Sequence, residues 1–288
     1  MASSRGGLNE LSLALLIALI WGATFPVVRV SSDVGTVLFW RFLLSTPLMG
    51  ILYLTLRGFP LVNIPSITYG VIGGFLNFLF VHFMFKALTV APSYYVSAIF
   101  YVNPLLTLAI GVLLGLEAPS VRGALGVLLG FSGVVLINVS SLNFESFHHI
   151  GLVYALLSAI LFSLLSITSR FSNTSVETYT LLQLLVASIV AVAVLGLKPI
   201  VGLKPWDYIA VAHQGLGAGL IALILWFKLL NKSISLASTL VYMVPLVSYL
   251  TALPIAGELP GLPDIVGLAL ILAGIYLAIG GRRRGSTY

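Results

Sequence analysis

Long apolar segments recur along this chain and restrict it to folds that a lipid bilayer can surround. A helix that crosses a bilayer needs about 20 mostly apolar residues. Ten segments meet this requirement: 9–29, 34–56, 65–86, 92–115, 120–140, 149–169, 177–197, 206–227, 234–256 and 262–281. Only 8% of the 288 residues are charged, whereas soluble domains carry roughly 25%. We therefore predict an all-α membrane protein with ten transmembrane helices.

The Lys and Arg residues indicate how these helices are oriented. If the N-terminus is cytoplasmic, nine of the 14 Lys and Arg residues lie at cytoplasmic ends, and five lie on or near the other side. Cytoplasmic loops of membrane proteins carry an excess of these residues. We therefore predict a multi-pass protein of the plasma or bacterial inner membrane, in contact with lipid, with both termini cytoplasmic. The first apolar segment has no signal-peptide cleavage site, so we expect it to remain as a span.

Several functional classes are disfavoured by what the sequence lacks. The net charge is +6, but the basic residues form no stripe with interleaved aromatics, so we expect no nucleic-acid partner. The chain has no cysteine, and the adjacent His148 and His149 are too few ligands for a metal site. Motifs of serine hydrolases, diphosphate-binding enzymes and zinc proteases are absent. We therefore expect no cofactor, no metal and no enzymatic activity, and no carbonyl filter or charge ring indicates a channel.

The two halves of the sequence resemble each other at a constant offset. The segment YVNPLLTLAIGVLLGLE (101–117) shares Tyr, Pro, Leu and Glu with YMVPLVSYLTALPIAGE (242–258), 141 residues later. Four glycines follow the same offset: Gly126 with Gly267, and Gly133 with Gly274. We predict two five-span repeats, residues 1–146 and 147–288. Because five is odd, the second repeat must be inverted, and inverted repeats around a midplane site are typical of secondary transporters that work by alternating access.

Several short motifs resemble those of one transporter family. The segments IWGATFPVVRV (20–30), FWRFLL (39–44), FKAL (85–88) and GLALILAGIYL (267–277) are similar, in order and spacing, to those of the drug/metabolite transporter superfamily. The similarity is specifically to its EamA-type ten-span members and covers nearly the whole chain. It implies two inverted five-helix repeats around a central cavity, with the fifth and tenth spans at the periphery.

The same resemblance implies a function in one of two forms. Members of the family export amino acids and other small metabolites, or exchange nucleotide sugars and organic phosphates. We expect a secondary active transporter that exports amino acids or related zwitterionic or anionic metabolites. The alternative is an antiporter or exchanger of phosphorylated metabolites or nucleotide sugars. We expect a monomer or a homodimer, since the segment GVLLG (126–130) admits either a dimer contact or packing within the chain.

Arg41 is a candidate substrate contact because it lies about seven residues into the segment 34–56, inside the predicted membrane interior. A buried guanidinium usually faces a cavity, a partner or a substrate. Two interpretations stay open. Arg41 binds a carboxylate or phosphate of the substrate, which Arg can hold through two hydrogen bonds, or it has a structural role. The second repeat has Gln183 in the corresponding place, so we expect an asymmetric site.

Two stripes of hydroxyl-bearing residues are also candidates. Tyr94, Ser97 and Tyr101 follow spacings of three and four, which place them on one face of a helix. Ser238 and Tyr242 occupy the corresponding places in the second repeat. These residues would bind substrate across a central cavity, or they would form the interhelical hydrogen bonds that are common in membrane proteins.

Pro104 and Pro245 correspond to each other in the two repeats. Each lacks a backbone N–H and frees the carbonyl four residues earlier, on Phe100 and Val241. We predict a kink at each proline, which either shapes the cavity and flexes during transport or is a static feature satisfied by neighbouring groups.

Trp21, Asn77, His82, His213 and Gln214 complete the set of candidate substrate contacts. The two histidines are either proton relays or side chains held by hydrogen bonds near an interface. Asn77 and His82 are five residues apart, about 140° around a helix, so both should not point at one site. Trp21 would stack on an aromatic or sugar substrate, or pack in the core.

Three further residues have predicted structural roles. Trp226 lies near the end of a predicted span, where we expect it to join the interfacial aromatic belt. Glu117 and Glu258 lie at span ends, and each should fix a helix end or pair with a nearby Arg. Since no acidic residue lies deep in a span, the deep carboxylate used by small multidrug exporters is missing.

Overall fold

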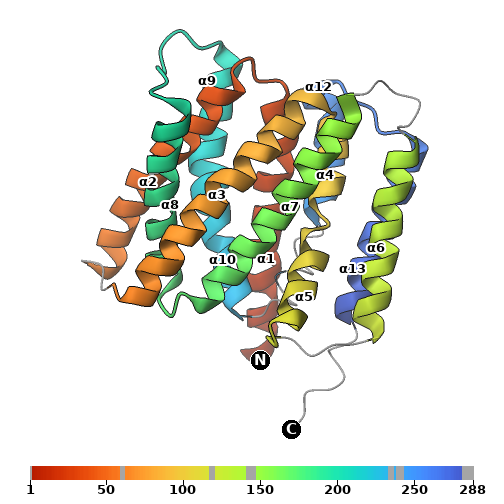
Figure 1. The fold of residues 1–288 in the computed structure, drawn as a ribbon, viewed down its shortest axis with the longest axis horizontal. Coiled ribbons are helices and arrows are strands. Elements are labelled where there is room, and N and C mark those ends of the chain that lie inside the picture. The colour runs from red at the N-terminus through yellow and green to blue at the C-terminus, as the bar shows by residue number, and fades with distance from the viewer. Residues whose placement is uncertain are drawn as a thin grey trace.

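The computed structural model describes residues 2–58, 62–116, 121–140, 147–232, 237 and 243–280. Every regular element in these residues is a helix, as predicted (Figure 1). The first half contains α1 (Ala2–Arg29), α2 (Val34–Arg57), α3 (Ile64–Val90), α4 (Ser93–Phe100), α5 (Asn103–Leu113) and α6 (Val121–Ser140). The second half contains α7 (Phe147–Phe171), α8 (Val176–Leu195), α9 (Pro205–Ala212), the π-helix η2 (His213–Ile221), α10 (Ala222–Lys232), α12 (Met243–Ala256) and α13 (Leu262–Gly280).

Seven stretches of the described chain are long and apolar enough to cross a membrane: Ser12–Arg29, Val34–Leu56, Ile64–Val90, Ser93–Leu113, His149–Phe171, Val176–Leu195 and Pro205–Asn231. Two shorter apolar helices, Met243–Ala256 and Leu262–Gly274, follow them. All nine coincide with predicted segments, and α6 coincides with the fifth. The structure therefore supports a multi-pass membrane protein, while the full count of ten spans stays a prediction.

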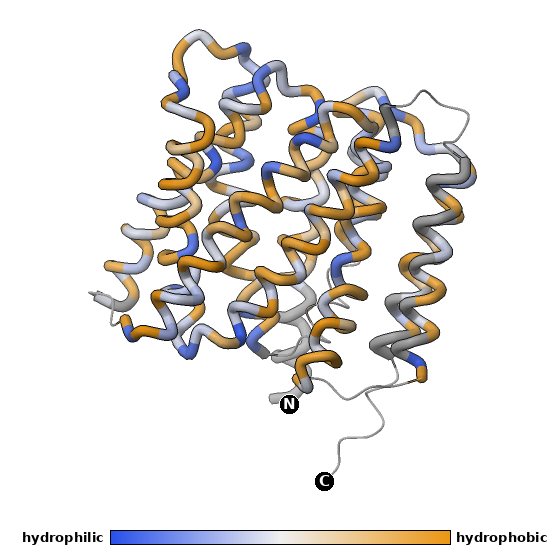
Figure 2. Tube along the Cα trace, in the orientation of Figure 1, coloured by the Kyte–Doolittle hydropathy of each residue, from blue (hydrophilic) through white to orange (hydrophobic). Residues whose placement is uncertain are grey.

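Apolar side chains cover the outside of the bundle. Leu19, Ile51, Ile189 and Leu250 are each more than half exposed, and Figure 2 shows hydrophobic residues along all the helices, with many of the most hydrophilic residues near helix ends. A soluble monomer rarely exposes so large an apolar surface. Contact with lipid tails accounts for it, because in that medium exposed apolar groups carry no penalty.

The fourth predicted span is interrupted near its middle. Helix α4 ends at Phe100 and α5 begins at Asn103, so Tyr101 and Val102 lie between them. Pro104 is in the first turn of α5 and cannot donate to the carbonyl of Phe100. The side-chain amide of Asn103 donates to that carbonyl instead, at 2.9 Å. The break therefore keeps its backbone oxygen hydrogen-bonded inside the bundle, and it turns Tyr101 inward, where it is 2% exposed.

Helices α6 and α13 pack antiparallel against each other at one edge of the molecule (Figure 1). A Cβ atom on Gly133 would collide with the carbonyl oxygen of Gly267, and one on Gly274 would collide with that of Gly126. These are the four glycines that the repeat pairs at an offset of 141 residues. The missing side chains let the two backbones touch, as small residues do in membrane helix pairs. Packing within the chain is thus the observed role of this glycine segment.

The α1–α2 loop is held by polar contacts at the end of α1. The carboxylate of Asp207 accepts the backbone N–H of Ser32 at 2.8 Å. Asp33 caps α2 by accepting the backbone N–H of Thr36 at 2.9 Å. Partial burial raises the pKa of Asp33, but the hydrogen bonds from Thr36 and the nearby Lys198 lower it by more, so this pKa lies below its usual value. The carboxylate is therefore charged and available as a helix cap at neutral pH.

The glycine contact between α6 and α13 predicts a difference between two identical substitutions. Gly133→Ala should destabilise the protein by about 1–3 kcal/mol, because the added methyl group must push the α13 backbone away. Gly50→Ala is the matched control, since a Cβ atom there would meet no atom within 4 Å, and it should be neutral or stabilising by up to about 1 kcal/mol. Thermal unfolding in detergent measures both. Equal melting temperatures for the two variants would contradict the close backbone contact.

Candidate functional site

A cavity lies between α1, α2, α3 and α7, beside the break between α4 and α5. Nine residues line it: Trp21, Thr24, Phe25, Arg41, Phe80, Met84, Phe100, Tyr101 and Phe162. The space between them is about 310 Å³, and only part of it is wide enough for a water molecule. The part that a water-sized sphere can enter is only about 20 Å³, room for one or two water molecules and far below the volume of small-molecule sites. The cavity is therefore nearly closed in this conformation, and its lining is nearly all apolar.

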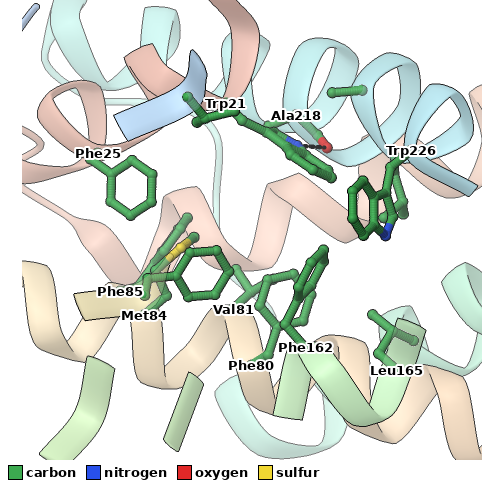
Figure 3. Close-up of a cluster of buried hydrophobic side chains, with 14 of the residues drawn as sticks. Trp21, Phe25, Phe80, Val81, Met84, Phe85, Phe162, Leu165, Ala218 and Trp226 are labelled. Atoms are coloured by element: carbon green, nitrogen blue, oxygen red, sulfur yellow. Dashed lines mark hydrogen bonds between the residues drawn. The ribbon is translucent and has the colours of Figure 1, made fainter. Parts of the chain in front are cut away.

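Aromatic rings form most of the cavity wall. Figure 3 shows Trp21 and Phe25 on one side, facing Phe80, Met84 and Phe162 on the other. The rings of Phe80 and Phe162 meet edge to face with centroids 5.0 Å apart. Trp21 lies 5.8 Å from Phe162, also edge to face. Such packing favours rigid walls, because aromatic pairs add stability beyond the area they bury.

Trp226 lies in the core behind this wall, which corrects the prediction that it belongs to the interfacial belt. It is 1% exposed, and its ring is 5.8 Å from Trp21 and 5.6 Å from Phe162. Position along a span does not reveal which face of the helix a residue occupies. The inward face of α10 turns this tryptophan toward α1 and α7 despite its place near the end of a span.

Arg41 brings a single positive charge to the cavity wall. Its side chain is 3% exposed, and Nη1 donates to Oε1 of Gln214 at 2.6 Å. Its Nε has no hydrogen-bond partner, and no carboxylate in the described part of the chain lies within ion-pair distance of it. Arginine stays protonated in proteins. The guanidinium is therefore charged, buried, oriented by a neutral amide and still able to donate.

The π-helix η2 positions this part of the site. A π-helix is wider than an α-helix, and short π segments occur frequently at functional sites. Two backbone oxygens of η2 accept side-chain hydrogen bonds from other spans: Trp21 Nε1 donates to Ala218 at 3.2 Å (Figure 3), and Ser45 Oγ lies 2.7 Å from the oxygen of Gly215. Gly219 leaves room for Ser45 and for the aliphatic stem of Arg41. The segment thus holds α1 and α2 in place around the cavity.

Asn77 and Gln183 form a second buried polar pair, away from the cavity lining. Nδ2 of Asn77 donates to Oε1 of Gln183 at 3.1 Å, which joins α3 to α8. The remaining amide atoms, Asn77 Oδ1 and Gln183 Nε2, have no partner. Gln183 is the residue that corresponds to Arg41 in the repeat, so each of them bonds to an amide in the other half of the chain. One pair is charged and the other is neutral, which gives the asymmetry that the sequence predicts.

The two histidines do not line the cavity. His82 packs between Phe78 and Phe83, with ring centroids 5.7 Å from each. Nδ1 of His213 lies 3.1 Å from Nε2 of Gln214, so this ring supports the amide that contacts Arg41. Asn77 and His82 have different surroundings, in agreement with their predicted divergence around the helix.

The predicted stripe on α4 is divided in the structure. Tyr101 lines the cavity, whereas Tyr94 packs edge to face against Tyr249 at 5.8 Å. Ser97 is fully buried, and its hydroxyl has no partner. Pro245 is buried in the first turns of α12. The other two predicted contacts, Ser238 and Tyr242, lie outside the described residues.

Six lining residues were not predicted from the sequence: Thr24, Phe25, Phe80, Met84, Phe100 and Phe162. Five of them are apolar, and an apolar side chain in a membrane helix can face either lipid or the interior. Hydropathy carries no signal that separates the two cases. Thr24 is polar, but its hydroxyl lies 3.3 Å from the carbonyl oxygen of Ile20 on the same helix, as many threonines in helices do.

A polar cluster joins the ends of four helices, α1, α3, α4 and α12, beyond one end of the cavity. Glu258, just after α12, binds Nε of Arg29 at 3.1 Å and accepts both the backbone N–H and the hydroxyl of Ser93 at 2.6 Å. Arg29 also donates to the backbone oxygens of Leu88 and Thr89. We call these residues the Arg29–Glu258 cluster. It confirms the predicted pairing of Glu258 with an arginine, and Glu117 lies outside the described residues.

Arg170 makes related contacts at the opposite end of the bundle. It donates to the backbone oxygens of Leu230 and Asn231, at 3.4 and 3.2 Å. Arg170 follows Arg29 by 141 residues, and its two acceptors follow those of Arg29 by 142. Both arginines therefore end one span and hold the end of another, in matching places of the two halves.

The charged pair in the site predicts unequal effects from removing two buried glutamines. Gln214→Leu leaves a buried guanidinium nitrogen without its acceptor, which should cost about 1.5–3 kcal/mol. Gln183→Leu is the matched control, because Gln183 is equally buried but bonds to a neutral amide, and it should cost about 0.5–1.5 kcal/mol. Thermal unfolding in detergent compares them. A larger loss in Gln183→Leu would contradict the assignment of Gln214 as the partner of a buried charge.

Comparison with known proteins agrees with this architecture. The model of the EamA-like transporter family matches the chain twice, at residues 8–139 and 149–280. The "Uncharacterized transporter YxxF" of Bacillus subtilis (strain 168) is 24% identical over 219 residues, which are 75% of this chain and 70% of that protein. A solved structure titled "Crystal structure of protein" has a TM-score of 0.69 and 25% identity, covering 96% of this chain and 99% of the other. The two family matches span most of the chain, which therefore belongs to the EamA-like transporter family.

Proposed function

We propose that this protein is a secondary active transporter that exports amino acids or related small metabolites by alternating access. Membership of the EamA-like family establishes membrane transport of small molecules as the general function. The cavity that Trp21, Arg41 and Tyr101 line is an interior space in the bundle, and in the proposal it widens to hold the substrate when one end of the bundle opens. Asn77, His82, Tyr94 and the other predicted contacts outside this lining have supporting roles in the proposal.

The observation that carries the proposal is the free Nε of Arg41 in an otherwise apolar wall. A guanidinium binds a carboxylate through charge-assisted hydrogen bonds, which are roughly twice as strong as neutral ones. Gln214 occupies one nitrogen and fixes the orientation of the group, so Arg41 is positioned before the substrate arrives. The low polarity of the cavity strengthens the attraction further. Arg41 thus has both a structural contact and the capacity to bind a ligand.

Contacts that recur in both halves support alternating access. The glycines of α6 and α13 contact each other reciprocally, and Arg29 and Arg170 make matching contacts at opposite ends. Two inverted units, residues 1–146 and 147–288, would produce such pairs. In the proposed cycle, the Arg29–Glu258 cluster closes one end of the cavity and must break for that end to open. The kinks at Pro104 and Pro245 would accommodate this movement.

The proposed setting is the plasma or bacterial inner membrane, with both termini cytoplasmic and the protein acting as a monomer or homodimer. Helix α1 begins and α13 ends at the same end of the molecule (Figure 1). This arrangement agrees with termini on one side of the membrane. The excess of Lys and Arg predicted for that side supports a cytoplasmic assignment.

The alternative, an exchanger of phosphorylated metabolites or nucleotide sugars, is less well supported by the cavity. A phosphate group carries up to two negative charges near neutral pH. Arg41 is the one charged residue among those that line the cavity. A single guanidinium matches the charge of a carboxylate better than that of a phosphate monoester. The first form of the function therefore fits the described site more closely.

Counterflow in proteoliposomes tests the transport function. Vesicles loaded with a mixed pool of amino acids and related metabolites should accumulate one labelled compound at a time. Arg41→Gln should reduce this accumulation at least tenfold, which corresponds to about 1.4 kcal/mol of lost substrate binding. Lys204→Gln is the control, since it removes an exposed positive charge outside the cavity. Accumulation of sugar phosphates or nucleotide sugars instead would favour the exchanger, and no counterflow of any compound would contradict transport.

Thiol labelling tests the gating role of the Arg29–Glu258 cluster. The native chain has no cysteine, so Thr24→Cys gives a single reporter in the cavity wall. Adding Glu258→Gln should raise labelling by a membrane-impermeant maleimide, applied from the side of Arg29, about fivefold. This factor corresponds to the loss of about 1 kcal/mol from a partly exposed ion pair. Glu177→Gln, which removes a contact with Lys228 at the other end, should leave labelling from this side unchanged. Equal rates in all three proteins would contradict a gate here.

A further inference from the structure

No acidic residue lines the cavity in the part of the chain that the structure describes, and the positions of the acidic residues in the sequence agree with this. The sequence contains eight of them: Glu10, Asp33, Glu117, Glu145, Glu177, Asp207, Glu258 and Asp264. Each one precedes a span, follows one, lies in a connection or belongs to the first turn of a helix. Among the carboxylates whose side chains the structure describes, none is therefore placed to pair with a positive charge at the depth of Arg41.

The polar groups in the cavity wall also favour a negative ligand. Arg41 is a buried cation whose nearest partner, Gln214, is neutral, and its Nε is unsatisfied. The other polar side chains of the lining are the hydroxyls of Thr24 and Tyr101. A hydroxyl is neutral and cannot compensate a full charge. A buried charge without a counter-charge is costly in a membrane protein, and a bound anion would remove this cost.

A ligand with an ammonium group meets the opposite situation. An α-amino acid places its ammonium within a few ångströms of its carboxylate, so binding the carboxylate to Arg41 brings two positive charges together. Like charges at that distance repel strongly in a medium of low polarity. Removing the ammonium from water without an acidic partner adds a desolvation cost. A dianion is also disfavoured, because after one of its negative charges pairs with Arg41 the other remains buried without a positive partner.

The apolar part of the wall indicates the shape of the ligand body. Figure 3 shows the rings of Trp21, Phe25, Phe80 and Phe162 around a narrow space, and Phe100 also lines it. Aromatic rings pack well with one another in stacked or edge-to-face arrangements. The space is too small for a ring in this conformation, so the walls must separate first. A flat ring between the separated walls would replace the aromatic contacts that they lose, and a carboxylate attached to it would pair with the guanidinium.

From this arrangement we propose that the transported molecule is an organic monoanion, an aryl-substituted monocarboxylate that lacks an ammonium group. The inference rests on the proposed function, since it takes the cavity as the transport site. Within the compounds which that function covers, it selects metabolites related to amino acids over the zwitterionic amino acids themselves. The site therefore distinguishes ligands by whether they carry a positive charge beside the carboxylate that binds Arg41.

Four ligands with the same ring and carbon chain test this selection. They are 3-phenylpropanoate, an anion; L-phenylalanine, the same molecule with an added ammonium; 3-phenylpropan-1-amine, a cation; and 3-phenylpropan-1-ol, which is neutral. Isothermal titration calorimetry at pH 7.5 measures their binding to the full-length protein in lipid nanodiscs, with empty nanodiscs subtracted. 3-Phenylpropanoate should bind at least about tenfold more tightly than each of the others, as expected for one charge-assisted contact.

Variants connect this preference to Arg41. Arg41→Gln should reduce the affinity for 3-phenylpropanoate at least about tenfold and leave the affinity for the neutral alcohol within about twofold. Arg41→Lys should fall between the wild type and Arg41→Gln, because it keeps the charge but loses the planar donor pair. Lys204→Gln controls for net charge outside the cavity. If Arg41→Gln does not fold, the comparison of the four ligands on the unaltered protein still decides the question.

The outcomes separate this inference from the proposed function. Binding of L-phenylalanine as tight as that of 3-phenylpropanoate would overturn the monoanion assignment. Binding of none of the four, together with saturable counterflow of some other metabolite, would overturn the assignment as well, while transport itself would stand. Absence of counterflow for every compound would instead count against the proposed function. Selective binding of the anion that Arg41→Gln abolishes would support the inference.

Discussion

The buried charge of Arg41 is the constraint on which the rest of the site depends. A guanidinium inside a membrane bundle must be oriented and partly satisfied by the protein, because neither water nor lipid will do so. Gln214 supplies one acceptor, and the amide nitrogen of Gln214 is in turn within hydrogen-bond distance of Nδ1 of His213. Lacking a side chain, Gly219 lets the stem of Arg41 lie against η2. The neighbouring structure therefore makes the charge tolerable without neutralising it.

The aromatic wall depends on the same region. Trp21 donates to the backbone of η2 and at the same time presents its ring to the cavity and to Trp226. One residue thus connects the backbone that positions Gln214 with the rings that define the shape of the space. The break between α4 and α5 adds a further part of the cavity wall, because Tyr101 lies in the break and lines the cavity. Interrupted helices of this kind commonly build the sites of membrane transporters.

The ends of the bundle are organised by the two matching arginines. Arg29 and Arg170 each bind the backbone end of a span from their own half, so they act within units. Glu258 adds a bond from the second half to the first, through Arg29 and Ser93. Of the two arginines, only Arg29 therefore also bonds to the other half, in the part of the chain that the structure describes. Further polar contacts between the halves lie deeper in the bundle, at Arg41 and Asn77.

The spans, the repeat and the most polar site residue could all be read from the sequence. Hydropathy can be calculated from the order of residues alone, so it reveals the apolar segments. A lone arginine in such a segment is conspicuous because burying a charge in a membrane has a high free-energy cost. Trp21 and Tyr101 were also predicted, Trp21 as a ring that could stack on a substrate and Tyr101 as part of a stripe of hydroxyl-bearing residues on one helix face. The presence of a neutral Gln183 in the place that corresponds to Arg41 further indicated that the two halves of the site would differ.

Only the tertiary structure decided which apolar residues face the cavity. Phe80 and Phe162 line it, and Ile189 and Leu250 face lipid, yet all four are apolar residues within predicted spans. Trp226 was misplaced for the same reason. In a soluble protein the polar face of each helix marks the outside, but in a membrane both faces are apolar. The sequence alone therefore determined where the long apolar helices lie and where a charge lies within one of them, whereas the packing of the helices determined the cavity.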